Sequence, residues 1–527
     1  MRRSAGHLAP LVSGPAAPRI HAPLFPASHS RAALGDTDVT ANSVTSIEQR
    51  SIDFIPHSER HGSVRSLFTL WFGGNLQVTA IAAGAITVAV GLPLPWALLA
   101  IVVGNLVGAV FMALHSAQGP RLGIPQMIQS RAQFGYLGAV LPLLLVLLMY
   151  VGYFASSAVL TGQAISSWLG LPVDLSIVAA NVVTAVLALY GYRLLHATEK
   201  WLSVISGIGF LVLSVQLVRH VGIGDWNASG FSWGTFLLAT SIAATWQLTY
   251  APYVADYSRY LPADTPVRAS FWYTYTGTVL ASSWMFAFGA VATAAAAKAF
   301  AGGSVDFIVG QAGTATWAFF LIIIAGNICV NALNLYGMFM SATTTLTVFV
   351  KGPVNVTMRT LIVVSAAAIG TVLAITGRSN FLDNFTNFIL LLAYFLIPWT
   401  SINLVDFYLV RKERYAIDDI FERDGRYGGV DWRAMTAYIA GIVIELPLVS
   451  SAFYVGPLVA PLGGADISWI VGIFVSGGLY LLIMKAAPVR RGHLATEGDV
   501  PVPGGADHSR SGGGMSVIET AQGEANS

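Results

Sequence analysis

Long apolar stretches alternate with short polar loops along most of this chain, and the pattern predicts membrane-spanning helices. A hydrocarbon core of about 30 Å requires roughly 20 apolar residues in helical form. Each backbone polar group must then be satisfied within its own helix. The sequence therefore predicts an all-α membrane protein with twelve transmembrane helices. The predicted spans are residues 66–90, 95–115, 138–165, 174–191, 200–219, 234–256, 270–298, 312–346, 357–377, 384–410, 434–458 and 466–485.

Composition supports this class and narrows the chemistry. Charged residues make up 10% of the chain, compared with about 25% in soluble domains. The single cysteine, Cys329, excludes an internal disulfide and a cysteine-based metal centre. No span carries paired carboxylates, a histidine cluster or a nucleophile beside a base, so we expect neither an enzyme nor a cofactor. The expected partners are the lipid bilayer and a small molecule, not nucleic acid, and the oligomeric state is not indicated.

Basic residues are concentrated in alternate loops, which predicts the orientation of the chain. With a cytoplasmic N-terminus, the outer loops hold only Arg219, Lys298 and Arg378. We therefore expect both termini in the cytoplasm and the protein in the plasma membrane. The inner loops hold Arg121, Arg131, Arg193, Lys200, Arg259, Arg268, Lys351, Arg359, Arg411, Lys412, Arg414, Arg423, Arg426 and Arg433.

Both ends of the chain lack the apolar pattern. Residues 1–60 are rich in Pro, Ala, Ser and His, and residues 486–527 are rich in Gly and Ser. Such composition is typical of disordered tails. The first of these tails, with arginine and no acid near its start, also resembles a targeting segment. The predicted organisation is thus a transporter-like domain of residues 61–485 between two cytoplasmic tails.

The first span contains paired glycines followed by polar residues. Gly73 and Gly74 precede Asn75, Gln77 and Thr79. Glycine pairs allow a helix to break, and a broken backbone inside a membrane requires polar surroundings. Close packing of two helices at small residues would give a similar pattern. Because the polar and small residues are adjacent, we favour a broken helix whose Asn75 and Gln77 contact a substrate.

The sixth span shows a second such interruption. Trp246, Gln247 and Thr249 lie near its middle and Pro252 follows, which removes a helical hydrogen bond. Two interrupted helices at corresponding places in two halves indicate a transporter binding site. The spacing predicts a 5+5 inverted repeat, spans 1–5 and 6–10, with spans 11 and 12 appended and helices 1 and 6 discontinuous.

Two further spans carry candidate substrate contacts. Tyr150 and Tyr153 are three residues apart, so they share a face of the third span and provide either core packing or a stacking platform. Asn327, Asn331 and Asn334 form one stripe on the eighth span. Three buried amides on one face favour a role facing a cavity over interhelical hydrogen bonds alone.

Acidic residues are few and mostly near span ends. Asp256 and Arg259, one turn apart, are candidates for an inner gate. Asp406 lies towards an end of span ten, where we expect water to reach it. Glu445 lies deep in span eleven, outside the ten-helix unit, so a structural or subunit contact is favoured over a proton carrier.

Four segments resemble the nucleobase–cation symporters of the purine–cytosine permease, cytosine permease and hydantoin transporter group. The resemblance covers roughly residues 48–485, and its most specific strings are Ser-Arg-Ala-x-Phe-Gly-Tyr and Ala-Asp-Tyr-Ser-Arg-Tyr. It implies a secondary active transporter that imports a nucleobase such as cytosine or a purine by alternating access. The four segments are IEQRSIDFIPHSERHG, PQMIQSRAQFGYLGAVLP, YVADYSRYLP and NALNLYGMFMSATT.

The resemblance also implies a site between the third, sixth and eighth helices. Relatives hold a planar ring between an aromatic residue of the third helix and a residue of the sixth. The matching positions of the sixth helix here are Trp246, Gln247 and Thr249, and Asn327 matches the asparagine that the family has on the eighth helix. Tyr150 and Tyr153 stand where the cytosine permease pattern has Gln-x-Gly-Trp, which leaves open another ring compound such as allantoin, uracil, a hydantoin or a thiamine-like vitamin. A membrane-embedded substrate sensor is the alternative from a different class.

The coupling ion follows from the same resemblance. Sodium-coupled relatives place hydroxyl residues on the eighth helix where this chain has Val330 and Asn331, and valine has no side-chain oxygen. We therefore favour protons over sodium. If sodium is the ion, backbone carbonyls near Thr79, Ala80 and Ala83, with Asn331, are its candidate ligands, and no other metal is expected.

Overall fold

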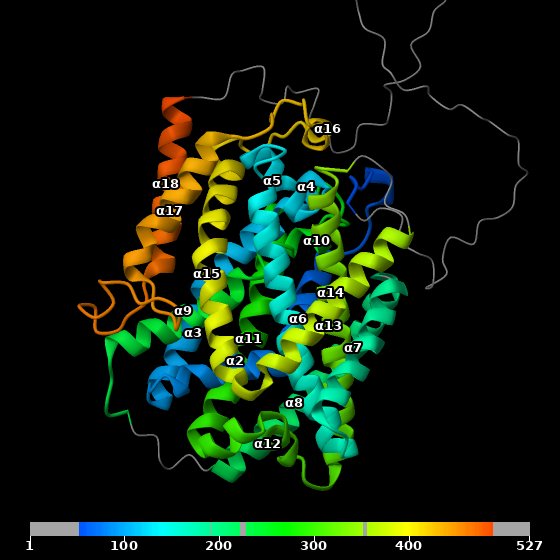
Figure 1. The fold of residues 1–527 in the computed structure, drawn as a ribbon, viewed down its shortest axis with the longest axis vertical. Coiled ribbons are helices and arrows are strands. Elements are labelled where there is room, and N and C mark those ends of the chain that lie inside the picture. The colour runs from blue at the N-terminus through cyan, green and yellow to red at the C-terminus, as the bar shows by residue number, and fades with distance from the viewer. Residues whose placement is uncertain (1–51, 191, 222–227, 351–355, 488–527) are drawn as a thin grey trace, which may run out of the picture. The chain divides into compact units, whose positions relative to one another are not determined.

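Helices form nearly all the secondary structure in residues 52–190, 192–221, 228–350 and 356–487, which the computed structural model describes (Figure 1). Within these ranges the only strand pairing is an isolated bridge between Ser450 and Val455. The predicted tail residues 1–51 and 488–527, and Lys351, lie outside them. The spans are helices α1 (Ser66–Gly74), α2 (Val78–Ala89), α3 (Leu94–Ser116), α6 (Val140–Leu169), α7 (Val173–Tyr190), α8 (Tyr192–Val221), α9 (Trp233–Leu248), α10 (Val254–Ser258), α11 (Val267–Gly302), α13 (Thr316–Leu346), α14 (Val356–Gly377), α15 (Phe381–Val405), α17 (Trp432–Glu445) and α18 (Ser468–Ala486).

Length and hydropathy alone mark seven helical stretches of the described residues as able to cross a membrane. One of them, Val356–Val410, contains both α14 and α15, and the α1–α2 pair adds an eighth span. The remaining predicted spans consist of shorter helices. For example, α9 has 16 residues before its break and α17 has 14. Counting each broken helix once, all twelve predicted spans are helical.

The first span is broken as predicted. Helices α1 and α2 meet at an angle of 61°, and residues 75–77 between them are not helical. Gln77 has extended backbone angles of φ −141° and ψ 153°, so the chain leaves one helix before it enters the next. A β-carbon on Gly73 would lie 2.0 Å from the Ser203 hydroxyl oxygen, so α8 packs directly against this segment.

The sixth span is also interrupted. Helix α9 ends at Leu248 and α10 begins at Val254, with turns over the residues between them. Pro252 lies in this interval and has no amide proton to continue the helical ladder. Both predicted discontinuities are therefore present, each at a point where glycine or proline weakens the helix.

The helices pack in two groups that follow the predicted repeat. Spans one, two, six and seven form one group, in which α11 packs on α1, α2 and α3, and α3 packs on α9. Spans three, four, eight and nine form the other, in which α6, α7, α13 and α14 pack on one another. We call these the bundle and the scaffold. Each contains the corresponding spans of both halves.

Short helices between corresponding spans show the inversion. Helices α4 (Gln118–Leu122) and α5 (Gln126–Phe134) connect spans two and three, and α12 (Ser304–Gly310) connects spans seven and eight. Figure 1 shows α4 and α5 at one end of the helices and α12 at the opposite end. Equivalent connections at opposite ends are the expected result of an inverted repeat.

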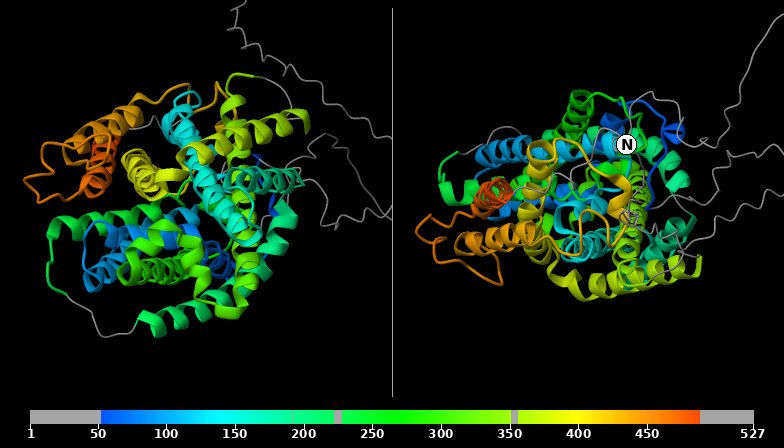
Figure 2. Two further views of the ribbon diagram at one scale, coloured as in Figure 1. Left: turned by 60° about the horizontal axis from the view of Figure 1, so that its bottom comes forward. Right: turned by 90° about the horizontal axis from the view of Figure 1, so that it is seen from above.

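The two appended spans lie at one edge, where α17 and α18 pack on each other and on α15 (Figure 2). The expectation that water reaches Asp406 was wrong, because its exposed fraction is 0%. Its carboxylate accepts hydrogen bonds from Tyr415 and Tyr480, at 2.7 Å each, and pairs with Arg411 at 3.0 Å. A buried carboxylate requires such partners, and here they join α15 to α18.

The predicted N-terminal tail extends too far at its inner end. Residues 52–60 are packed rather than free of the helices, because Ile55 and Arg60 are both buried. The Ile55 amide donates to the Gly123 carbonyl at 2.9 Å, and Arg60 donates to the Pro120 carbonyl at 2.6 Å. These contacts fix the segment on the turn after α4, so the domain begins before residue 61.

The predicted end of span eleven was also wrong. Helix α17 ends at Glu445 rather than residue 458, and a 3-10 turn, Leu446–Leu448, follows it. Pro447 cannot donate to the helical ladder, which explains the early end. Glu445 is buried against α18, and a β-carbon on Gly472 would lie 2.3 Å from its Oε2 atom. This position agrees with a structural contact but tests no function.

Candidate functional site

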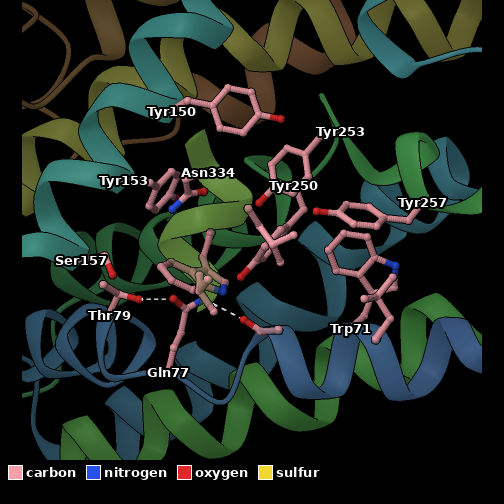
Figure 3. A pocket seen from close by; sticks show the side chains of 15 residues that line it. Trp71, Gln77, Thr79, Tyr150, Tyr153, Ser157, Tyr250, Tyr253, Tyr257 and Asn334 are labelled. Atoms are coloured by element: carbon pink, nitrogen blue, oxygen red, sulfur yellow. Dashed lines mark hydrogen bonds between the residues drawn. The ribbon is translucent and has the colours of Figure 1, made fainter. Parts of the chain in front are cut away.

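A cavity lies where the breaks of the first and sixth spans face α6 and α13 (Figure 3). It encloses about 660 Å³ of empty space, including the part open to solvent. The lining residues are Leu70, Trp71, Gly74, Gln77, Thr79, Tyr150, Tyr153, Ser157, Trp246, Tyr250, Tyr253, Tyr257, Val330, Leu333 and Asn334.

Aromatic rings dominate the lining. Tyr153 and Trp246 face each other edge to face, with centroids 5.9 Å apart at 87°. Trp71 and Tyr250 make a similar contact at 5.5 Å. Such rings offer large apolar faces to a flat ligand. The bundle supplies three of these rings and the scaffold supplies Tyr153.

One hydrogen bond joins the bundle and the scaffold at the cavity. The hydroxyls of Tyr153 and Thr249 are 2.8 Å apart. The Thr249 hydroxyl donates to the Trp246 carbonyl at 2.7 Å, so the Tyr153 hydroxyl must be the donor to Thr249. This bond connects α6 of the scaffold to the break between α9 and α10.

Several predicted substrate residues line the cavity. Tyr150, Tyr153, Trp246, Gln77 and Asn334 all contribute to its surface. Figure 3 shows Gln77 beside Thr79 at one side of the cavity and Tyr150 at the opposite side. The structure therefore brings together residues from four spans, while their contact with a substrate remains a prediction.

Other predicted substrate residues are not part of the lining. Asn75 and Gln247 are fully buried and bonded to other side chains of the bundle. Gln247 follows Trp246 by one residue, about 100° around the helix, so it faces α3 instead of the cavity. Thr249 is buried and reaches the site only through its bond to Tyr153.

The asparagine stripe of α13 is only partly in the site. Asn334 lines the cavity, and its Nδ2 donates to Asn331 Oδ1 at 3.2 Å. Asn331 is buried and donates to the Phe154 carbonyl at 3.1 Å. Asn327 is not part of the lining, although Val330, three residues further along α13, is. Its buried Nδ2 atom has no hydrogen-bond partner in the described part of the chain.

Sequence reasoning missed four of the seven aromatic residues in the lining. Tyr250, Tyr253 and Tyr257 are spaced by three and four residues, and this spacing was the available signal. Pro252 hid it, because a break between α9 and α10 makes helical spacing unreliable. Trp71 and Ser157 also line the cavity, and Trp71 Nε1 and Ser157 Oγ are buried without a partner among the described residues.

The gate candidates line a second, smaller cavity of about 270 Å³. Asp256 and Arg259 lie on its surface, together with three tyrosines that also line the first cavity, namely Tyr150, Tyr253 and Tyr257. Asp256 Oδ1 accepts from the backbone N–H of Gln126 in α5 at 2.7 Å, and Arg259 donates to the backbone carbonyl of Asp53 at 3.2 Å. The tyrosines thus separate the two cavities.

Three of the four candidate cation ligands lie in α2, directly after the first break, and the fourth lies on α13. The Thr79 hydroxyl donates to Gln77 Oε1 at 2.6 Å, and Ala80 and Ala83 are buried in α2. The fourth candidate, Asn331, donates to Phe154 as described above. No cluster of three or more His, Cys, Asp or Glu side chains that could hold a metal ion occurs in the described ranges.

Comparisons with known proteins place this architecture in a family. The profile of permeases for cytosine/purines, uracil, thiamine and allantoin matches residues 54–472. A Bacillus subtilis protein described as a purine-cytosine permease is 45% identical over 440 residues, which cover 83% of this chain and 96% of that protein. The purine-cytosine permease of Emericella nidulans is 26% identical over 464 residues, covering 83% and 88% of the two chains.

Solved structures agree with the fold. Mhp1, a nucleobase-cation-symport-1 family transporter in a closed conformation with bromovinylhydantoin bound, has a TM-score of 0.67 at 19% identity, covering 86% of this chain and 98% of that one. Its inward-facing conformation gives a TM-score of 0.70, covering 86% and 97%. The chain therefore belongs to the cytosine/purine permease family. It is an integral membrane transporter and not an enzyme, which confirms the predicted fold class and family.

Proposed function

We propose that this transporter imports a nucleobase, cytosine or a purine, by alternating access in symport with protons. The observation that carries this proposal is an aromatic cavity at the junction of two broken helices. A flat, uncharged ring can pack against Tyr153 and Trp246, whose centroids are 5.9 Å apart. Movement between these rings would accompany binding, because the gap between them must widen to admit a ring.

Unpaired polar atoms of the lining support a heterocycle over an apolar ring. Trp71 Nε1 and Ser157 Oγ are buried, and neither has a partner in the described residues. Buried polar groups are nearly always hydrogen-bonded, so a ligand or water must supply the missing partner. Ring nitrogens and carbonyl oxygens of a nucleobase are suitable acceptors for both groups. Other rings of the family's range, uracil, thiamine and allantoin, carry such acceptors too.

Protons are the proposed coupling ion because the candidate sodium ligands are poorly supplied with free oxygens. Val330 lines the cavity and has no side-chain oxygen. The Asn331 Oδ1 atom already accepts a hydrogen bond from Asn334 Nδ2 at 3.2 Å. Sodium prefers several oxygen ligands, so this arrangement favours protons, with backbone carbonyls near Ala80 and Ala83 as the alternative.

The proposed orientation places α4, α5 and α10 on the cytoplasmic side of the plasma membrane, with both termini in the cytoplasm. Arg121, Arg131 and Arg259 all belong to this end, in agreement with the positive-inside pattern. In this orientation the second cavity, with Asp256 and Arg259, is the exit for an imported substrate. Tyr150, Tyr253 and Tyr257 then stand between the substrate and the cytoplasm.

Thermal stabilisation of the purified protein tests the proposal. A ligand that binds the folded state raises the melting temperature as its concentration exceeds its dissociation constant. The panel contains nucleobases, allantoin, hydantoins and vitamins, each with and without sodium and at two pH values. A shift with cytosine or a purine that depends on pH but not on sodium is expected. If no nucleobase shifts the melting temperature but another ring compound does, that compound becomes the proposed substrate.

A matched pair of variants tests the site itself. Ser157→Ala removes one unpaired polar atom of the lining and should weaken the best ligand. Ser476→Ala removes an equally buried and unpartnered hydroxyl in α18, outside the cavity, and should leave the ligand shift unchanged. Equal shifts in all three proteins would contradict binding beside Ser157.

A further inference from the structure

Asn75, in the break between α1 and α2, is the most highly connected amide beside the cavity. Its exposed fraction is 0%, and it does not belong to the lining. The Oδ1 atom accepts three hydrogen bonds, from Trp246 Nε1 at 2.8 Å, Tyr250 Oη at 2.9 Å and Ser282 Oγ at 2.7 Å. An amide oxygen has two lone pairs, so no acceptor capacity is left for a substrate.

The amide nitrogen of Asn75 is also fully used. Its Nδ2 donates to the Trp71 carbonyl at 2.7 Å and to Thr278 Oγ1 at 3.1 Å. The chemistry of the partners fixes this orientation, because an indole N–H can only donate and a carbonyl can only accept. If the oxygen and nitrogen of Asn75 were exchanged, Nδ2 would face the Trp246 N–H, and two donors would meet without an acceptor. Asn75 therefore cannot turn an unused group towards the cavity.

The hydrogen bonds continue behind the cavity through the rest of the bundle. Thr278 of α11 donates to Gln247 Oε1 at 2.6 Å, and Gln247 Nε2 donates to Asn105 Oδ1 at 2.7 Å. Asn105 of α3 donates in turn to the Ile101 carbonyl at 3.0 Å. The chain of side chains connects the first, seventh, sixth and second spans, which are all four spans of the bundle.

The consequence for the cavity is that two of its rings have no hydrogen-bond donor left for a substrate. Trp246 and Tyr250 both line the cavity, but their only hydrogen-bond donors point to Asn75 behind it. An indole has no other polar group, and the hydroxyl of Tyr250 has no second proton. Towards a substrate, Trp246 can offer only its apolar ring, so recognition of a ring edge falls to other lining residues such as Ser157.

We propose that Asn75 is a positioning residue that determines substrate preference without touching the substrate. It holds the donors of Trp246 and Tyr250 away from the cavity, so that these rings stack and do not select among ring edges. The inference rests on the proposed function, since it assumes a heterocycle bound in this cavity. Freed of Asn75, the two donors would turn towards the cavity and favour ligands with more carbonyl oxygens on the ring edge.

Competition among ring compounds tests the inference. Uracil has two carbonyl oxygens on its edge, whereas cytosine has one carbonyl oxygen, an amino donor and a ring nitrogen that accepts. In Asn75→Ala, the ratio of the uracil to the cytosine dissociation constant should shift towards uracil by about tenfold, which corresponds to one buried hydrogen bond. Ser282→Ala is the matched control, because it removes the third donor to the same oxygen without altering a lining residue. Its ratio should stay within about twofold of the wild type.

The result that would overturn the inference is an Asn75→Ala protein whose dissociation constants for all rings rise by one common factor. That outcome would make Asn75 merely structural. If Asn75→Ala does not fold, Tyr250→Phe gives the answer, since it removes the hydroxyl alone. A hydroxyl that donates to Asn75 has no proton to offer a ring edge, so the ratio should change little. A tenfold change in Tyr250→Phe would show that the hydroxyl contacts the substrate and would also overturn the inference.

A ligand-free measurement separates this inference from the proposed function. The melting temperatures of wild type, Asn75→Ala, Tyr250→Phe and the double variant form a cycle that isolates their coupling. Non-additive effects are expected, and additive ones would contradict the hydrogen bond itself. If no nucleobase binds the wild type, the proposed function fails while this cycle still reports on Asn75. The ratios are then measured with whichever ring compound the panel identifies.

Discussion

Amide side chains occur in two places near the cavity, and their surroundings differ. In the bundle, Asn75 and Gln247 are buried and bonded on both their oxygen and nitrogen atoms. On α13 of the scaffold, Asn327 has a buried nitrogen with no partner in the described ranges, and Asn334 lies at the cavity surface. Amides therefore join the helices of the bundle through hydrogen bonds, whereas some amides of the scaffold have hydrogen-bonding groups that no atom of the described residues satisfies.

The difference indicates which group of helices is held together and which is adapted for a ligand. A buried amide with all its bonds made by protein resists movement of its neighbours, since each broken bond exposes an unpaired polar group. The bundle contains both broken helices, where the ladder of backbone bonds is interrupted, so it has the greater need of side-chain bonds. An amide with spare capacity can bind a ligand at little cost to the fold.

The largest expected effect is on stability when leucine replaces the saturated amide. Asn75→Leu leaves the buried donors of Trp246, Tyr250 and Ser282 without their common acceptor. Each unpaired buried donor costs about 1–3 kcal/mol, so the free energy of unfolding should fall by about 3 kcal/mol or more. Denaturant unfolding in detergent, followed by near-ultraviolet circular dichroism, measures this loss.

The matched substitution on α13 should do far less. Asn327→Leu removes a nitrogen that already lacks a partner, so its expected change in unfolding free energy is within about 1 kcal/mol. A similar large loss in both variants would mean that the two amides are equally engaged, and the distinction between bundle and scaffold would fail.

The next effect, on binding, concerns two neighbours in the α13 stripe. Asn334→Ala removes an amide from the cavity surface and should weaken the best ligand by about tenfold, with little change in stability. Asn331→Ala should instead lower stability by about 1 kcal/mol, because it breaks the bond to the Phe154 carbonyl. Thermal shifts with and without ligand measure both quantities. If Asn331→Ala instead weakened binding and Asn334→Ala lowered stability, the substrate contact would belong to Asn331.

The fold was largely predictable because the membrane imposes simple rules on the sequence. The length of apolar stretches marks a span, and glycine or proline beside polar residues marks a break, as at Gly73 and Pro252. The errors occurred where these rules do not apply. Helix α17 ends early although its sequence stays apolar beyond Pro447, and residues 52–60 pack through backbone contacts that their polar composition does not indicate.

The candidate site was less predictable because one residue type can serve two purposes. Asn75, Gln247 and Asn327 are amides of the kind that commonly contact a ligand. The direction of each side chain, however, depends on its position around the helix and on partners distant in sequence. Asn75 meets Ser282 across 207 positions of the chain. Tyr257 shows the opposite error, since its spacing from Tyr250 and Tyr253 indicated a shared surface, but the break at Pro252 made that spacing unreliable.

The smallest expected effect concerns the bond that joins bundle and scaffold across the cavity. Tyr153→Phe removes the hydroxyl that donates to Thr249 at 2.8 Å but keeps the ring for stacking. One neutral hydrogen bond contributes about 0.5–1.5 kcal/mol, so ligand affinity should change by no more than about tenfold. Tyr153→Ala, which also removes the ring, should weaken binding further. Thr249→Ser retains the acceptor and should behave as the wild type in the same uptake and binding assays. If Tyr153→Phe were as damaging as Tyr153→Ala, the hydroxyl and not the ring would be the main contribution of Tyr153, and contact between the two groups of helices would matter more for transport than stacking.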